Sequence, residues 1–361
     1  MTTTFTIEQA TGRSAQEREA LLAAPGFGTI FSDHMSRIDW TADGGWHDHR
    51  VVGYAPFALD PASAVFHYAQ EAFEGLKAYA HADGSVWRFR ADVNAERFQR
   101  SCRRLGLPEL PVEDFLASVD ELVTLDQAWV PRGEEQSLYL RPFMFARTAA
   151  LAVKPSTQVT YAVIASPSGA YFGGSGVVPV DIWFTRSYSR SAPGGTGFAK
   201  CGGNYAASMV AQQEAEANGC SQVGFVDATE HQWVEELGGM NLFAVSADGE
   251  LVTPQLSETI LEGVTRGAVL TLVEDAGLSV TERRVSLDEL YEGIDSGHFT
   301  ELFACGTAAV ITPVASLKDE DGQHVVSGRE PGATTLALRQ QLTDIQYGLA
   351  EDRHGWMHRI V

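Results

Sequence analysis

The chain has 361 residues, more than one hydrophobic core normally supports, so two domains are expected. Its 26 basic and 47 acidic residues give a formal charge of −21, which argues against nucleic acid or an anionic membrane as a partner. The four cysteines form no Cys-x-x-Cys pair, no metal site is expected, and no apolar run approaches the roughly 20 residues of a membrane helix. The start of the chain lacks the plan of a signal peptide, so these features favour a cytoplasmic protein with reduced thiols.

The first half of the chain mixes strands and helices. Residues 1–30 show no sustained apolar period and are expected to form an arm. A helix is predicted over residues 94–105, capped by Asn94 and stopped by Gly106 and Pro108. The other elements predicted in this half are a second helix near 112–128 and strands at 86–89, 137–145 and 158–166.

A segment rich in glycine, proline and serine follows at residues 166–176 and is typical of a hinge. Its aromatic residues Tyr171 and Phe172 either anchor the loop or pack against a substrate. Beyond residue 178, short strands are predicted at 180–184, 223–227, 240–245 and 299–303, and helices at 205–217, 263–276, 287–294 and 334–350. The pattern predicts two α+β domains, at residues 1–168 and 180–361, joined by a loop at 169–179.

Lys200 lies in the segment Gly-Phe-Ala-Lys-Cys-Gly-Gly-Asn-Tyr, and it is one of only four lysines in the chain. Glycines at 202 and 203 let the backbone approach a ligand closely. A desolvated lysine amine can lose its proton and attack a carbonyl, which a guanidinium cannot do. The segment therefore suits a Schiff base, although a lysine in a flexible surface loop is the commoner arrangement.

Two glycine-containing turns could bind a phosphate. Residues 261–266, Leu-Glu-Gly-Val-Thr-Arg, open a helix whose free N–H groups and positive dipole end favour an anion. Residues 306–309, Gly-Thr-Ala-Ala, follow a predicted strand and offer backbone donors with a hydroxyl. Each turn alone is too common a pattern to define a site, and the chain has neither a P-loop around Lys200 nor a dinucleotide fingerprint after a strand.

Two carboxylates, Glu235 and Glu236, precede a double glycine and an apolar strand. Strand alternation sends their side chains to opposite faces, so at most one is expected to point inward, where it needs a cationic partner. A protonated pyridine nitrogen would be such a partner. A lysine, a carboxylate and a phosphate cradle together indicate pyridoxal 5′-phosphate as a cofactor.

Four segments together closely resemble the branched-chain amino acid aminotransferases, which are fold-type IV pyridoxal phosphate enzymes. The segments are residues 65–79, the Lys200 segment, residues 236–243 and residues 306–314, in the family's order and over most of the chain. The resemblance implies an α+β fold of fold type IV, with a smaller N-terminal domain and a larger C-terminal domain that binds pyridoxal phosphate. It also implies a homodimer that moves amino groups between L-leucine, L-isoleucine or L-valine and 2-oxoglutarate, in biosynthesis or in degradation.

The resemblance assigns cofactor contacts where residues match. Lys200 is similar to the catalytic lysine that binds the cofactor covalently and shuttles a proton. Glu236 matches the carboxylate that faces the pyridine nitrogen, and Tyr205 matches the phenol that bonds the cofactor O3′. Arg97, which the bare sequence would assign to a solvated helix surface, matches the arginine that binds the phosphate. The other cofactor positions that the resemblance implies are Gly239, Val264, Thr265 and Thr307.

Substrate contacts are implied in the same way. Arg141 resembles the residue that receives the side-chain carboxylate of glutamate, whereas a surface ion pair would be its ordinary role. Tyr68, Leu151 and Val153 resemble residues that family members lend across a dimer interface. Core packing would be the ordinary role of Phe73, Leu151 and Val153. The remaining substrate positions implied are Phe73, Tyr139, Tyr171, Thr307 and Ala308.

Two positions depart from family patterns. Ala309 and Thr312 stand where animal members carry a Cys-x-x-Cys switch, so redox control by that route is not expected. Gly239 stands where some members have threonine, which leaves that pocket contact open. The alternative functions are a D-amino acid aminotransferase or an aminodeoxychorismate lyase, which would share Lys200 and Glu236, and a catalytically silent scaffold that binds pyridoxal phosphate.

Overall fold

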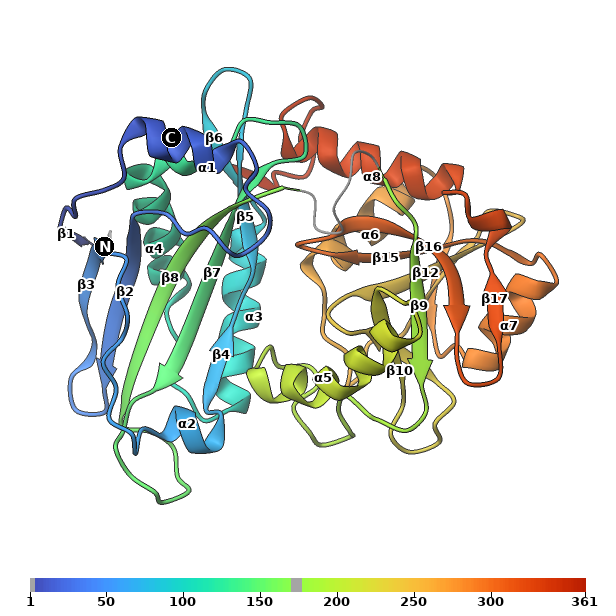
Figure 1. The fold of residues 1–361 in the computed structure, drawn as a ribbon, viewed down its shortest axis with the longest axis horizontal. Coiled ribbons are helices and arrows are strands. Elements are labelled where there is room, and N and C mark those ends of the chain that lie inside the picture. Colours follow the sequence, from blue (N-terminus) through green and yellow to red (C-terminus); the bar gives the residue numbers. More distant parts are fainter. Residues whose placement is uncertain (1–3, 170–176) are drawn as a thin grey trace. The chain divides into compact units, whose positions relative to one another are not determined.

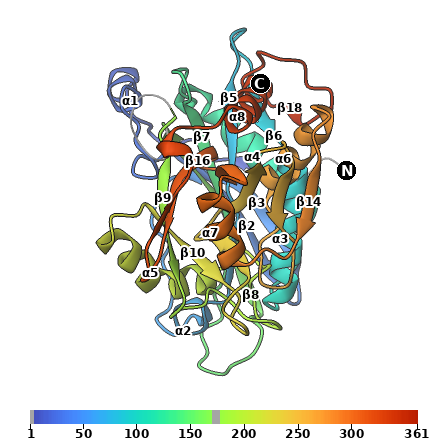
Figure 2. The same ribbon diagram turned by 90° about the vertical axis from the view of Figure 1, so that its right-hand side faces the viewer.

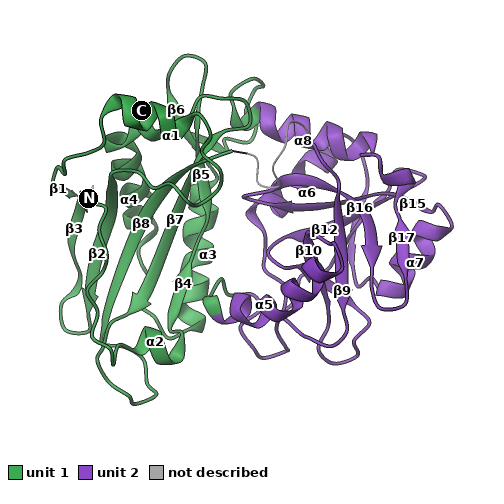
Figure 3. Cartoon of the chain, viewed as in Figure 1, with its two compact units in different colours: residues 1–173, 199–202, 345–361 green, residues 174–198, 203–344 purple. Residues whose placement is uncertain are grey.

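The computed structural model describes residues 4–169 and 177–361, and the chain divides into two compact units (Figure 3). The first unit comprises residues 1–173, 199–202 and 345–361, and the second comprises residues 174–198 and 203–344. The units interleave along the chain, whereas consecutive domains are expected from the sequence. As a result, the short segment that carries Lys200 belongs to the first unit although both of its flanks belong to the second.

The first unit is built on one mixed sheet in the order β1-β3-β2-β8-β7-β5-β6-β18, with β4 beside β7 (Figure 1). Its long strands β7 and β8 pair in register, for example Phe143 with Ala162. The strands predicted at 86–89, 137–145 and 158–166 are confirmed, and the last runs on to Ser168. The strands are β1 (Thr6–Ile7), β2 (His34–Thr41), β3 (Gly45–Gly53), β4 (Glu71–Phe73), β5 (Leu76–Ala80), β6 (Val86–Phe89), β7 (Ser137–Ala146), β8 (Gln158–Ser168) and β18 (Met357–Arg359).

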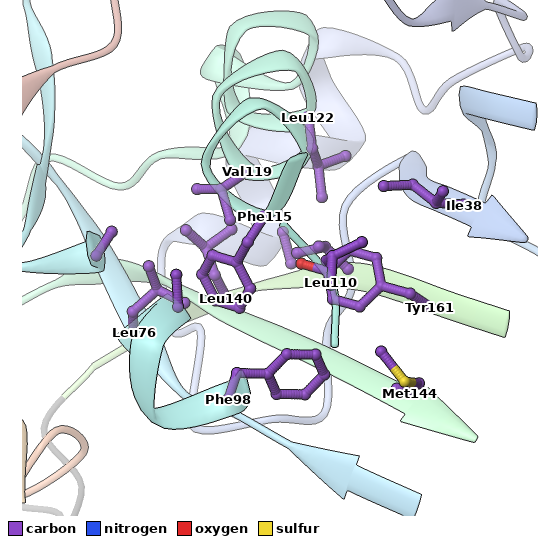
Figure 4. Packing of buried hydrophobic residues seen from close by; sticks show 14 of the residues in the cluster. Ile38, Leu76, Phe98, Leu110, Phe115, Val119, Leu122, Leu140, Met144 and Tyr161 are labelled. Atoms are coloured by element: carbon purple, nitrogen blue, oxygen red, sulfur yellow. The ribbon is translucent and has the colours of Figure 1, made fainter. Parts of the chain in front are cut away.

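Helices α3 (Ala91–Arg104) and α4 (Val112–Leu125) pack on this sheet. The buried side chains between the helices and the sheet form the hydrophobic core of the unit (Figure 4). On α3, Phe98 and other buried residues recur at helical spacing. The ring of Phe98 lies 5.7 Å from that of Phe115 on α4 and 5.6 Å from that of Tyr161 on β8. Because each buried apolar side chain contributes about 1.5–3 kcal/mol, this cluster holds α3 firmly against the strands.

The helix predicted at 94–105 begins earlier, at Ala91, so the expectation that Asn94 caps it is wrong. Asn94 is buried instead, and its side-chain amide donates a hydrogen bond to Glu74 Oε2 at 2.8 Å. The predicted stop is confirmed, because Gly106 adopts a left-handed φ of 64° just after the helix. The helix predicted near 112–128 ends at Leu125, and a separate 3-10 turn follows at Gln127–Trp129.

The first 30 residues are more structured than the expected arm. Strand β1 pairs in parallel with β3. Helix α1 (Ala15–Leu22) starts with a capping box, in which Ser14 and Glu17 each accept a hydrogen bond from the other's backbone N–H. None of the residues of α1 is buried, and the sequence shows no apolar period that would predict the helix. The capping box at its start is therefore the local feature that stabilises it.

The second unit also has a mixed sheet, in the order β11-β10-β9-β16-β15-β12-β13-β14 with β17 beside β16. Strands β9, β10, β14 and β16 of this sheet are labelled in Figure 2. The four strands predicted in this half are present with small shifts at their ends. The strands are β9 (Val180–Thr185), β10 (Gln222–Val226), β11 (Val234–Leu237), β12 (Asn241–Ser246), β13 (Leu251–Pro254), β14 (Val280–Arg283), β15 (Phe299–Gly306), β16 (Val310–Lys318) and β17 (Gln323–Val325).

The predicted helices of this half are present as well. They are α5 (Gly202–Ala217), α6 (Val264–Asp275), α7 (Leu287–Asp295) and α8 (Ala333–Gln346), with a 3-10 turn at Ser327–Arg329. Helix α5 begins at Gly202, so the two glycines after Lys200 belong to its first turn. Helix α7 begins after Ser286, whose hydroxyl accepts a hydrogen bond from the N–H of Glu289. None of the helices in the described ranges has the length and apolar character needed to cross a membrane.

Candidate active site

The first unit holds the backbone of Lys200 from both sides. Its N–H donates to the Ser101 hydroxyl at 2.9 Å, and its carbonyl accepts from the Phe73 N–H at 3.0 Å. The N–H of Gly202 donates to the Glu71 carboxylate, and a side chain at position 202 would clash with that carboxylate. The glycine is therefore needed for close approach, and the lysine amine projects from a fixed backbone.

The Phe73 ring is shared by two cationic side chains of the first unit. Lys200 Nζ lies 4.7 Å from the ring centroid, and Arg141 Cζ lies 4.9 Å from it. The negative face of an aromatic ring attracts both groups. An amine that can react with a carbonyl and a guanidinium that can bind a carboxylate thus border one apolar surface.

Arg141 keeps a donor for a ligand. Arg141 and Tyr139 lie on the same face of β7, and Arg141 Nη2 donates to the Tyr139 hydroxyl at 3.1 Å. Arg141 Nε is buried and has no hydrogen-bond partner among the residues that the structure describes. Gly75 makes room for the Tyr139 hydroxyl, because a side chain there would overlap it. An unsatisfied buried donor of this kind is what a bound carboxylate would satisfy.

Arg97 is buried, so its interpretation as a solvated helix charge is wrong. It is 4% exposed, and its Nε and Nη2 donate to the two Glu74 oxygens at 2.7 and 2.8 Å. Burial alone would raise the pKa of Glu74, but the charges of Arg97 and Lys200 outweigh it and hold that pKa below its ordinary value. The phosphate role of Arg97 stays a prediction.

Glu74→Gln is expected to lower the free energy of unfolding by about 3–5 kcal/mol, because it leaves the buried Arg97 guanidinium without its carboxylate. The folded pKa of Glu74 lies below the reference value of 4.5, so the ionised carboxylate stabilises the fold fully above that pH. This stabilisation is lost as the pH falls through the lowered pKa. Urea unfolding of both proteins at pH 7, and then at successively lower pH, should show the difference shrinking only below about pH 5.

The pair Arg103 and Glu109 provides a matched control for this prediction. Arg103 Nε and Nη2 meet the Glu109 oxygens at 2.8 and 2.7 Å, but the two side chains are 63% and 40% exposed. A solvent-exposed pair contributes at most about 1 kcal/mol, so Glu109→Gln should change the free energy of unfolding little. Equal losses for the two variants would contradict the importance of burial at Glu74.

In the second unit, Glu236 on β11 pairs with the buried Arg190. Arg190 Nη1 lies 2.5 Å from Glu236 Oε1, and the two side chains are 1% and 2% exposed. The same guanidinium nitrogen donates to the carbonyls of Gly197 and Thr259, while Leu261 donates its N–H to Glu236 at 3.3 Å. Arg190 Nε and Nη2 are buried and lack a hydrogen-bond partner in the described ranges. The guanidinium is the cationic partner that a buried carboxylate needs.

At most one carboxylate of the Glu235–Glu236 pair is expected to point inward, but both are buried, at 7% and 1% exposure. Glu235 accepts a hydrogen bond from the Thr259 hydroxyl. Burial raises the pKa of Glu235, and the Thr259 hydrogen bond offsets only part of this effect. Successive side chains of β11 point to opposite faces of the strand, as expected. Residues 254–260 cover the face that Glu235 occupies, so neither carboxylate points into open solvent.

Two turns of the second unit meet at the paired ends of β12 and β15. Asn241 pairs with Cys305, which places the Gly238-Gly239 hairpin beside the turn that starts at Gly306. A Cβ at Gly306 would lie 3.5 Å from the Gly239 carbonyl, and one at Gly239 would lie 3.7 Å from the Tyr205 ring. The Tyr205 phenol, the hairpin and the Gly-Thr turn are therefore neighbours.

The N-terminus of α6 reaches the same end of these strands. The Asn241 side chain donates to the Leu261 carbonyl at 3.1 Å and occupies the space that a side chain at Gly263 would need. Thr265 follows in the first helical turn and is 6% exposed. The α6 N-terminus, which suits a phosphate, thus begins at the strand end that also carries the Gly239 hairpin and the turn at Gly306.

Tyr68, Leu151 and Val153 lie on the surface of the first unit, at 39%, 69% and 84% exposure. The Tyr68 hydroxyl, at the end of α2 (Ala64–Tyr68), donates to the Leu151 carbonyl at 2.5 Å. Core packing is therefore the wrong interpretation of Leu151 and Val153 within this chain. Tyr171 lies outside the described residues.

Three charged residues at these sites are not foreseen from the sequence: Glu71, Glu74 and Arg190. Glu71 and Glu74 flank the apolar stretch around Phe73, and charges in such a stretch call for buried partners, which is a signal that sequence reasoning could use. Arg190 stands in a serine- and glycine-rich segment without periodicity, where no sequence signal marks it.

Known proteins are similar to this chain in both sequence and fold. A family model described as amino-transferase class IV matches residues 71–317. A protein of Streptomyces coelicolor named as a probable branched-chain-amino-acid aminotransferase is 55% identical over 348 residues, covering 96% of each chain. The crystal structure of the Escherichia coli branched-chain amino acid aminotransferase superposes with a TM-score of 0.76 at 26% identity, covering 90% of this chain and 100% of that one.

A second solved structure carries a bound adduct. It is another branched-chain amino acid aminotransferase, complexed with N-(5′-phosphopyridoxyl)-L-glutamate, and it superposes with a TM-score of 0.71. It is 26% identical and covers 90% of this chain and 98% of its own. The adduct bound to that protein joins a pyridoxyl phosphate group to glutamate.

Proposed function

The chain belongs to the class IV aminotransferases, and from this premise we propose that it is a branched-chain amino acid aminotransferase. It would exchange amino groups between L-leucine, L-isoleucine or L-valine and 2-oxoglutarate. The observation that carries the proposal is the Phe73 ring, which the Lys200 amine and the Arg141 guanidinium both contact. A reactive amine, an apolar surface and a carboxylate receiver are what an enzyme with both apolar and acidic substrates requires.

Each unit carries residues that suit pyridoxal 5′-phosphate. When bound, this cofactor supplies an aldehyde for the amine and a ring that takes up the electron pair released at the substrate Cα. Lys200 would hold the aldehyde, and Arg97, Thr265 and Thr307 would bind the phosphate. Thr265 stands in the first turn of α6, where the positive end of the helix dipole favours an anion.

Each remaining group has a defined task in the transfer. The Lys200 amine, once the substrate amine has replaced it, would carry the proton that leaves the substrate Cα. Glu236 would hold a proton on the ring nitrogen, and Arg190 keeps that carboxylate in place at 2.5 Å. The Tyr205 hydroxyl would donate a hydrogen bond to the cofactor O3′. The two amino acids of a cycle bind in turn, so ping-pong kinetics are expected.

Single half-reactions test the proposed function. Mixing the holoenzyme with L-leucine, L-isoleucine or L-valine should bleach the absorbance of the cofactor's aldehyde form, and 2-oxoglutarate should restore it. One methylene in an apolar pocket is worth only about 1–3 kcal/mol, so the three amino acids should differ modestly in rate. Turnover of D-alanine without turnover of L-leucine would favour a D-amino acid aminotransferase, and no bleaching by any of them would favour the silent scaffold.

Arg141→Met is expected to raise the KM for glutamate and 2-oxoglutarate far more than the KM for leucine. A second carboxylate costs several kcal/mol in an apolar pocket unless a charged donor meets it, and Arg141 Nε is buried with no hydrogen-bond partner in the described chain. Methionine keeps the apolar stem beside Phe73. Half-reactions run separately with each substrate measure the effect, and equal losses for leucine and glutamate would assign Arg141 to the fold or the cofactor instead.

We also propose that the protein is a homodimer. Tyr68, Leu151 and Val153 are exposed, and Phe66, which shares helix α2 with Tyr68, is 60% exposed, so the first unit presents several apolar side chains to solvent. Covering them with a second copy would remove this surface from water. Sedimentation equilibrium of the wild type and of Val153→Glu should show a dimer that the charged variant weakens.

A cytoplasmic location accompanies this proposal. Cys102, Cys201, Cys220 and Cys305 are all buried free thiols, a state that persists in a reducing compartment. Fractionation of cells followed by an activity assay would place the enzyme.

A further inference from the structure

The second unit contains a cavity of about 450 Å³ on the Glu235 side of β11. The start of β11, parts of the loops at residues 227–233 and 254–260, and the side chains of Pro193 and Arg284 line it. None of the residues assigned above to the cofactor or the substrates lines it. Because successive strand residues face opposite ways, the side chains of Glu235 and Glu236 point to opposite faces of β11.

Glu235 places an incompletely bonded carboxyl in this cavity. The residue is 7% exposed, and the Thr259 hydroxyl donates to its Oε1. Its other oxygen receives no hydrogen bond from any residue that the structure describes. Burial raises the pKa of Glu235, and the Thr259 hydrogen bond offsets only part of that effect. This oxygen is not itself buried, so it is open to the cavity and can accept a hydrogen bond from a donor that enters there.

The other carboxylates of the wall have partners or reach solvent. Asp227 accepts hydrogen bonds from four backbone N–H groups of residues 229–233, at 2.7 to 3.1 Å. Glu230 accepts from Arg284 at 3.0 Å, and Glu258 accepts from a backbone N–H at 3.0 Å. Glu235 is therefore the buried carboxyl residue of this wall whose second oxygen is open to the cavity.

The charges that line the cavity favour a cationic ligand over an anionic one. Four carboxyl side chains line the cavity, and Arg284, the lining guanidinium, is held by Glu230 and lies 4.1 Å from the Trp233 ring centroid. Amino acids and 2-oxo acids carry carboxylates that this wall repels. Leu256 and Ile260 supply an apolar surface next to Glu235.

We propose that this cavity is a binding site for a small organic ammonium ion. The cationic nitrogen donates to the open oxygen of Glu235, and a short aliphatic group packs against Leu256 and Ile260. The site is separate from the substrate site, and the proposal does not depend on which amino acids the enzyme transfers.

Isothermal titration calorimetry of the holoenzyme with N,N-dimethylbutylammonium chloride tests the proposal. A tertiary amine cannot condense with the aldehyde of the cofactor, so the heat contains no contribution from that reaction. We expect one saturable site, with a Kd on the order of a millimolar for so small a ligand. The neutral N,N-dimethylbutanamide, of similar shape, should bind at least about tenfold more weakly, because it cannot form the charge-assisted hydrogen bond.

Variants locate the bound ion. Glu235→Gln keeps an acceptor for Thr259 but removes the charge, and it should raise the Kd at least about tenfold. Glu274→Gln makes the same change of charge at an exposed position of α6 and should leave the Kd unchanged. Leu256→Trp narrows the cavity with Glu235 intact and should also weaken binding, which keeps the test open if Glu235→Gln does not fold. No saturable binding to the wild type, or equal affinities of Glu235→Gln and Glu274→Gln, would overturn the proposal.

Discussion

Lys200→Ala is expected to reduce the rate of amino transfer by at least about 10²–10⁴-fold, the range that a positioned proton-transfer group contributes. Lys200 Nζ lies 4.7 Å from the Phe73 ring centroid, and hydrogen bonds to Ser101 and from Phe73 hold its backbone. Alanine keeps these backbone contacts and removes the amine together with its aliphatic stem. The loss should therefore appear in the half-reactions with L-leucine and L-glutamate alike, while the free energy of unfolding changes little.

Two further measurements separate a chemical role of Lys200 from a structural one. Small primary amines added to Lys200→Ala should restore part of the rate, since a free amine can carry the proton, and a packing defect would not respond to them. Reduction of the wild-type holoenzyme with borohydride should fix the cofactor on Lys200. A label on Lys77, Lys154 or Lys318 would contradict the assignment. Lys154 is exposed, so Lys154→Ala serves as the control with ordinary activity.

The elements that sequence reasoning predicts well are those with local signals. The strand at 86–89 and the helices of the second half are confirmed because each carries its own apolar period or stop. Helix α3 shows the limit of the method. Asparagine is a residue type that commonly caps helices, but the Asn94 side chain donates a buried hydrogen bond to Glu74 instead. A tertiary contact therefore overrides the local preference.

The site residues divide in the same way. Lys200 can be picked out as a candidate site residue from the sequence because two glycines follow it, at positions 202 and 203. The partner of Arg97 is not visible, because Glu74 stands 23 residues earlier and only the fold brings their side chains to 2.7 Å. The burial of Glu235 is missed for a related reason. A strand pattern tells which residues share a face, but not whether a distant loop covers that face.

Glu236→Gln is expected to slow both half-reactions by about 10²–10³-fold, the typical loss when one preorganised electrostatic contact is removed. A neutral amide cannot hold a proton on the ring nitrogen, so the ring takes up electrons less readily. The variant should also lose about 3–5 kcal/mol of stability, because Arg190 is 1% exposed and would be left as an uncompensated buried charge. A slow enzyme could then be merely a partly unfolded one.

The double variant Glu236→Gln/Arg190→Met separates these two effects. Methionine removes the buried charge while filling much of its volume, so urea unfolding should show most of the lost stability restored. The half-reactions should remain slow, because the carboxylate that acts on the ring nitrogen is still missing. A pH titration of the cofactor absorbance adds a readout that stability does not affect, and the proton on the ring should be lost at lower pH in both variants. If the double variant regained the wild-type rate together with its stability, Glu236 would serve only to neutralise Arg190, and the carboxylate facing the cofactor would have to be sought elsewhere.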